Sequence, residues 1–161
     1  MKDRKRAFFR AALPVLTVAF LLFIFSNSMQ SGDRSGGISR SVSAFLASLW
    51  ERVSGRTIDL DLLHRVIRKL AHFSEFGVYS FLLSASCLQR RKSGSGLFFQ
   101  ALAAALFAAV TDEYLQTHIA GRGPSVTDVT IDLAGALTGL GLALLIGRSR
   151  LKKIGASRIR S

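Results

Sequence analysis

The sequence predicts an all-α, polytopic membrane protein with four transmembrane helices. Hydrophobic residues make up 49% of the 161 residues, against 20% that are charged, and they gather in four long apolar stretches. At about 1.5 Å per residue, each stretch with its flanks can cross a hydrocarbon layer about 30 Å thick. Since lipid offers the backbone no hydrogen-bond partners, we expect each stretch to be a helix.

Residues 1–25 form a basic start followed by the first predicted transmembrane helix, whose uncharged apolar run covers 11–25. A cleaved signal peptide is the alternative, because it also has a basic start and an apolar middle, and Ser26 and Ser28 are small enough for a cleavage site. The run approaches spanning length, which favours an uncleaved helix.

Residues 26–65 form the predicted extracytoplasmic connection. Residues 26–37 are rich in Ser and Gly, as is typical of a loop. Apolar residues then recur at helical spacing over about 38–53, which predicts an amphipathic helix. We expect this helix to lie along the outer membrane surface with Trp50 at headgroup level, or else to pack on the ends of the bundle.

Residues 66–147 hold three further predicted transmembrane helices, at about 66–88, 97–116 and 126–147, and 148–161 is a basic tail. Small residues that permit close helix approach recur at intervals of four in the last two of these helices. These predicted packing residues are Ala101, Ala105, Ala109, Gly135 and Gly139.

The 22 basic residues outnumber the 10 acidic ones and give a net charge of +12. Fourteen of the basic residues lie before the first stretch, between the second and third, and after the fourth. By the positive-inside rule, this pattern predicts a multi-pass protein of the cell membrane with both termini in the cytosol. Nucleic-acid binding is not expected, because the charges punctuate apolar runs instead of lining one face. The single cysteine, Cys87, excludes an internal disulfide.

Ionisable side chains lie within the predicted helices, although a charge at the bilayer centre costs about 2.5–3.5 kcal/mol. Counting the helical rise from the basic flanks places all the acids in the outer third of the membrane, so we expect one polar layer. The polar residues lie on the same helix faces as the small packing residues. We therefore expect the polar side chains to face one another and not the lipid. The candidate site comprises Lys69, His72, Glu75, Asp112, Glu113, Gln116, Arg122, Ser125, Asp128 and Asp132.

Several of these residues form spaced motifs over about 66–146 that resemble the VanZ-like family, small bacterial membrane proteins named for a teicoplanin-resistance protein. The motifs are Lys69-x-x-His72-Phe73-x-Glu75-Phe76, Asp112-Glu113-x-x-Gln116, Gly121-Arg122-x-x-Ser125-x-x-Asp128 and Gly135. The resemblance implies a polytopic helical protein of the cell envelope, whose founding relative reduces susceptibility to lipoglycopeptides. Asp132 stands where the family commonly has Asn, and Ala120 and His118 also depart from its pattern.

The favoured hypothesis is that the polar layer binds an anionic lipid or a lipid-linked envelope precursor, with a link to glycopeptide-type antibiotic susceptibility. Arg122 and Lys69 would hold phosphate, and the acids would orient these cations or contact polar headgroup atoms. The expected partners are therefore membrane lipids, and no cofactor is predicted.

Two alternatives stay open. In an enzyme, His72 with Glu75, Asp112 and Glu113 would supply acid–base chemistry or hold a divalent ion such as Mg²⁺ or Mn²⁺. No nucleophile motif or zinc-ligand spacing supports catalysis, so it is not the favoured hypothesis. In a purely structural layer, the same side chains would serve as interhelical hydrogen bonds worth about 0.6 kcal/mol each.

Overall fold

The computed structural model describes residues 2–29, 32–89, 95–119 and 125–159, and within these ranges every regular element is a helix. The helices in chain order are α1 (Lys2–Ser28), α2 (Gly32–Ser54), α3 (Leu60–Gln89), α4 (Ser95–Thr117) and α5 (Val126–Ile159).

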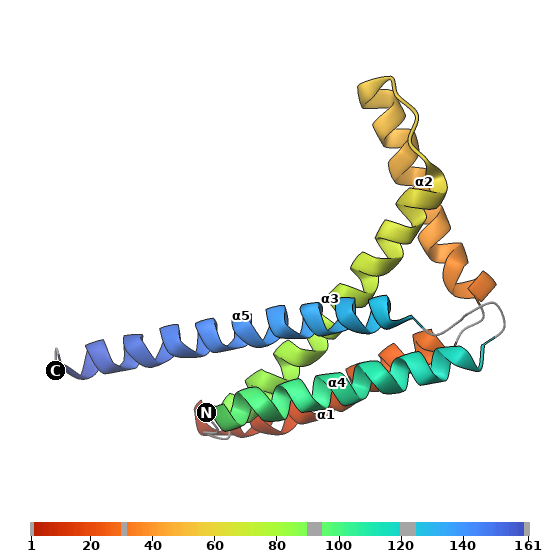
Figure 1. Cartoon of the computed structure of the whole chain (residues 1–161). Coiled ribbons are helices and arrows are strands. Elements are labelled where there is room, and N and C mark those ends of the chain that lie inside the picture. The colour runs from red at the N-terminus through yellow and green to blue at the C-terminus, as the bar shows by residue number, and fades with distance from the viewer. Residues whose placement is uncertain (1, 30–31, 90–94, 120–124, 160–161) are drawn as a thin grey trace.

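A bundle is formed by α1, the C-terminal half of α3, α4 and α5 (Figure 1). In it α1 lies beside α4, while α3 crosses α5. The helix α1 begins, and α5 ends, toward one end of the bundle. At the opposite end α1 and α4 terminate and α5 begins, so this end receives contributions from several helices.

Three helices are long and apolar enough to cross a membrane, over Ala11–Ser28, Gly96–Thr117 and Val126–Gly147. The fourth predicted span, 66–88, is helical but is not among them. The polar side chains of α3 lower its hydropathy, most strongly His72 and Glu75, followed by serines such as Ser80 and Ser84. These two serines are at most 1% exposed and face other helices, so they lower the hydropathy of α3 without facing the surroundings.

The crossing of α3 and α5 brings the two backbones into contact. A Cβ atom on Gly135 would overlap the carbonyl oxygen of Phe73, and one on Gly139 would overlap the carbonyl oxygen of Gly77. Any larger residue at these two positions of α5 would therefore push the helices apart, as expected for small residues at a helix interface.

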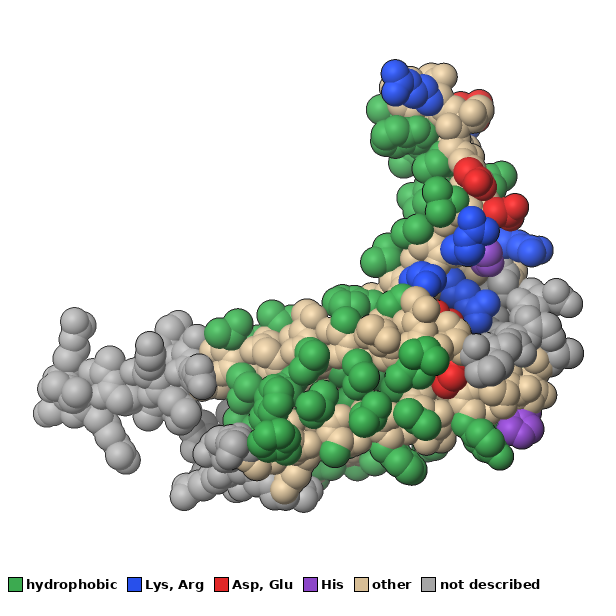
Figure 2. All heavy atoms as spheres, in the orientation of Figure 1, with side chains coloured by type: hydrophobic (Ala, Val, Ile, Leu, Met, Phe, Trp, Pro, Cys, Tyr) green, Lys and Arg blue, Asp and Glu red, His purple; other side chains and the backbone are tan. Residues whose placement is uncertain are grey.

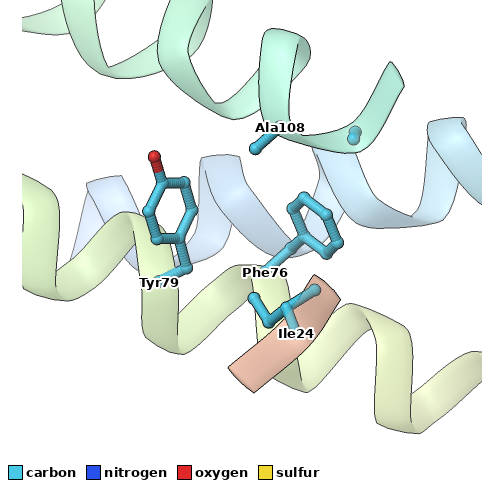
Figure 3. Close-up of a cluster of buried hydrophobic side chains, with 5 residues drawn as sticks. Ile24, Phe76, Tyr79 and Ala108 are labelled. Atoms are coloured by element: carbon cyan, nitrogen blue, oxygen red, sulfur yellow. The ribbon is translucent and has the colours of Figure 1, made fainter. Parts of the chain in front are cut away.

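The apolar core lies in the same region of the bundle. It consists of Ile24 from α1, Phe76 and Tyr79 from α3, and Ala108 and Ala109 from α4 (Figure 3). The rings of Phe76 and Tyr79 meet edge to face, with centroids 6.5 Å apart. Ala101, Ala105 and Ala109 are all buried, so this stripe of α4 faces the protein.

The helix α2 and the first part of α3, residues 60–70, form a helical hairpin that projects sideways from the bundle (Figure 1); we call it the arm. Gly55, in the left-handed region at φ 68°, ends α2. The Asp59 carboxylate then accepts hydrogen bonds from the amides of Asp61 and Leu62 and caps α3. Within the arm, α2 packs against the first part of α3. It does not pack on the ends of the bundle, which was one of its two expected positions.

Candidate functional site

A polar cluster occupies the end of the bundle where α1 and α4 terminate and α5 begins. It comprises Lys69, His72, Glu75, Asp112, Glu113, Gln116, Ser125, Asp128 and Asp132. The residues come from α3, α4 and the start of α5, so three segments far apart in the sequence build it.

The innermost contact joins His72 of α3 to Asp132 of α5. Their Nδ1 and Oδ1 atoms are 3.4 Å apart, and the two side chains are 12% and 2% exposed. This separation allows an ion pair, and neither atom has a hydrogen-bond partner among the described residues. The close α3–α5 crossing sets this distance, because the backbone contact between Gly135 and Phe73 lies next to both residues.

Asp112 of α4 lies beside this pair. One ligand atom each from His72, Asp112 and Asp132 lie within 4.8 Å of one another. The side-chain amide of Gln116 donates to Asp112 Oδ2 at 2.7 Å and to Ser28 Oγ at 3.4 Å. Gln116 therefore fixes the orientation of the Asp112 carboxylate and connects it to the end of α1.

The two glutamates of the cluster tie helices together. Glu75 accepts a hydrogen bond from the side-chain amide of Asn27 at 3.1 Å, which joins α3 to α1. Glu113 accepts one from the backbone N–H of Ser125, which anchors the start of α5 to α4. The Ser125 hydroxyl in turn accepts from the amide of Asp128 at 3.2 Å and caps α5.

The rim of the cluster is formed by Lys69 and Asp128, whose Nζ and Oδ1 atoms are 3.9 Å apart. The Lys69 side chain is 45% exposed, so this ion pair contributes little stability. Basic side chains gather where the arm joins the bundle (Figure 2), and Arg65 and Arg68 belong to the same stretch of α3 as Lys69. Positive charge thus lies at the rim and carboxylates lie behind it.

All the candidate site residues named from the sequence lie in this cluster except Arg122, which is outside the described residues. The sequence did not indicate which acid would meet His72. The enzyme hypothesis grouped it with Glu75, whereas its ion-pair partner is Asp132. His118 is exposed, follows the end of α4 and contacts Tyr114 of that helix, so it takes no part in the cluster.

Sequence reasoning missed Asn27 and Ser28, because the stretch from residue 26 onward was assigned to a loop. In the structure α1 continues through Ser28, and its last turn supplies partners to Glu75 and Gln116. The signal available was the short polar stretch Ser26-Asn27-Ser28 directly after an apolar run of spanning length.

Apolar helices of membrane-spanning length, with ionisable side chains buried between them at one end, define a helical membrane protein with an internal polar site. The chain belongs to the VanZ/LLP1 family, whose family model matches residues 11–147. The match extends beyond the motifs to α1 and the arm, so these parts belong to the family's domain as well. No curated protein and no solved structure matches the chain.

Proposed function

We propose that this VanZ/LLP1 protein spans the bacterial cell membrane four times, with both termini in the cytosol and the polar cluster toward the outside. The helix α3 supplies the fourth span. After Lys69 it carries a single acid, Glu75, which is bonded to Asn27, and its buried serines face other helices. A chain that crosses the membrane four times has both termini on the same side. This agrees with the structure, in which α1 begins and α5 ends toward the same end of the bundle (Figure 1).

In this arrangement the arm lies on the outer membrane surface. It projects sideways from the bundle, so it runs along the membrane plane when the bundle helices cross the membrane (Figure 1). Its apolar side chains lie on the side toward the length of the bundle, and charged side chains lie on the other side (Figure 2). The exposed apolar residues of the arm are Val42, Phe45, Leu46, Leu49, Trp50, Val53, Leu60, Leu62, Val66 and Leu70. Such a two-sided helix is typical of an interfacial element.

We further propose that the junction of arm and bundle binds the anionic headgroup of a lipid or of a lipid-linked envelope precursor. The observation that carries this proposal is the order of charges at the junction. Half-exposed Lys69, with Arg65 and Arg68 nearby in α3, offers charged donors to phosphate at the rim. The carboxylates behind them accept hydrogen bonds from headgroup hydroxyl or amide groups. The apolar face of the arm lies beside the junction and suits acyl chains.

The test measures lipid binding by the purified full chain in phosphatidylcholine nanodiscs with and without phosphatidylglycerol. The variant with Arg68→Ala and Lys69→Ala removes two charges at the junction. The control variant with Arg52→Ala and Arg56→Ala removes two from the exposed far end of the arm. Loss of even one charge-assisted hydrogen bond, at about 1.5–3 kcal/mol, predicts at least a tenfold loss of phosphatidylglycerol enrichment at the junction. Equal losses in the two variants would refute a headgroup site.

A link to antibiotic susceptibility is tested separately, by expressing the chain in a teicoplanin-susceptible bacterium. We expect the wild-type chain to reduce susceptibility to teicoplanin. The junction variant, at equal membrane abundance, should leave susceptibility unchanged. Unchanged susceptibility with abundant wild-type protein would reject the link and leave the lipid measurement to decide the headgroup site.

A further inference from the structure

The polar cluster contains more acid than its described cations balance. Five carboxyl groups, from Glu75, Asp112, Glu113, Asp128 and Asp132, lie with one lysine and one histidine. Glu75 and Glu113 accept hydrogen bonds from Asn27 and from the amide of Ser125, and Asp128 is paired at the rim with Lys69. The two least exposed carboxyl groups of the cluster, those of Asp112 and Asp132, lie deeper and beside His72.

We propose that His72, Asp112 and Asp132 bind a divalent transition-metal cation. We call these three residues the His–Asp–Asp group. They come from three helices, and one ligand atom from each lies within 4.8 Å of the other two.

The distance between His72 and Asp132 supports this assignment. Two ligand atoms each about 2.1 Å from one ion stand about 3.0 Å apart at a right angle and about 3.4 Å apart at the tetrahedral angle. The observed 3.4 Å between Nδ1 and Oδ1 falls at this separation, and neither atom has a hydrogen-bond partner among the described residues. The two atoms are therefore spaced as neighbouring ligands of one ion.

Burial supplies a second and independent observation. Asp132 is 1% exposed, and its Oδ1 atom has no hydrogen-bond partner among the described residues although it points at the His72 ring. A buried carboxylate oxygen without a hydrogen bond is costly, because water that would solvate it has been removed. A cation between the two aspartates and the imidazole offsets this cost and the repulsion between the carboxylates.

The surroundings hold the three ligands in place. Gln116 donates to Asp112 Oδ2, which fixes the plane of that carboxylate. The glycine contact of Gly135 with Phe73 fixes the distance between the helices that carry His72 and Asp132. Such supporting contacts orient metal ligands and commonly change affinity about 10–100-fold when removed.

The donor set selects the class of ion. One imidazole nitrogen with carboxylate oxygens suits Mn²⁺ or Zn²⁺, whereas Ca²⁺ and Mg²⁺ prefer oxygen ligands alone. A bound cation would also reduce the negative charge behind the rim and so weaken its repulsion of a phosphate group. This last role rests on the proposed function, whereas cation binding itself does not.

The experiment uses the full chain in detergent, stripped with EDTA and titrated with Mn²⁺ alone or Zn²⁺ alone. Free Mn²⁺ is measured by electron paramagnetic resonance, and bound metal by elemental analysis after gel filtration. We expect one ion per chain, and at least a tenfold loss of affinity in His72→Gln and in Asp132→Asn. The matched control is Asp61→Asn, the same carboxylate-to-amide change at an exposed position of α3, which should bind as the wild type does.

Asp132→Asn preserves the shape of the side chain, and its gel-filtration profile and thermal unfolding show whether it is folded. Absence of metal from the wild type, or equal binding by Asp132→Asn and Asp61→Asn, would overturn the cation site. Phosphatidylglycerol binding, measured with EDTA and with Mn²⁺, separates the two proposals. Lipid binding without any metal binding refutes the cation alone, and metal binding without any lipid binding refutes the headgroup function alone.

Discussion

The α3–α5 crossing makes the stability of the bundle sensitive to a single methyl group. In Gly139→Ala the new Cβ would overlap the carbonyl oxygen of Gly77 and would stand 3.0 Å from the amide nitrogen of Phe81. Both neighbours are backbone atoms of α3, which cannot rotate away as a flexible side chain can. The two helices must therefore separate locally.

The size of the effect follows from two opposing terms. Overpacking of a close contact costs about 1–3 kcal/mol. Replacing glycine by alanine inside a helix is favourable by about 0.8–1.0 kcal/mol. Gly141 gives a matched control, because a Cβ there meets nothing within 4 Å. The Gly141→Ala variant gains helix propensity without the clash, so the difference between the two variants isolates the crossing and should be about 1–3 kcal/mol.

The assay is unfolding of the full chain in mixed micelles with increasing SDS, followed by circular dichroism. We expect Gly139→Ala to unfold at lower SDS than Gly141→Ala, with the wild type between them or close to Gly139→Ala. If both alanine variants unfold together, the helices are not in backbone contact at Gly139, and the α3–α5 crossing does not set the His72–Asp132 distance.

Three further outcomes are expected. Gln116→Leu should destabilise the chain by about 1–3 kcal/mol in the same titration, because the buried Asp112 carboxylate loses the hydrogen bond from the Gln116 amide, whereas Gln100→Leu at an exposed position should be near neutral. Ser125→Ala should cost about 0.5–2 kcal/mol through loss of the α5 cap, and Ser125→Thr should retain most of it. Fluorescence of Trp50, the single tryptophan, should be quenched by brominated lipid in vesicles, and Val53→Glu on the same exposed apolar face should weaken the quenching.

Each of these outcomes has a contrary result that would count against its reasoning. Equal stability of the two leucine variants would mean that the hydrogen bond from the Gln116 amide to Asp112 contributes nothing to the stability of the chain. A Ser125→Thr variant as unstable as Ser125→Ala would remove the hydroxyl cap as the cause. Unquenched Trp50 in the wild type would place the arm away from the membrane surface.

The sequence by itself determined the helical class, because uninterrupted apolar runs in α1, α4 and α5 leave the backbone no other way to be satisfied in lipid. The motif residues likewise identified the family, which the match over residues 11–147 confirms. The recurrence of Gly135 and Gly139 indicated where a helix interface would form, since their spacing requires only the geometry of one helix.

The partners of the polar residues were decided by the tertiary structure. Helical spacing puts His72 and Glu75 on one face of α3, but the rotation and depth of α5 bring Asp132 to His72, while the last turn of α1 brings Asn27 to Glu75. The projection of the arm was likewise decided by the tertiary structure, because it depends on the packing of α2 against the first part of α3. The local sequence pattern determines which segments are helical and which residues share a helix face. Contacts between distant segments determine the partner of each side chain.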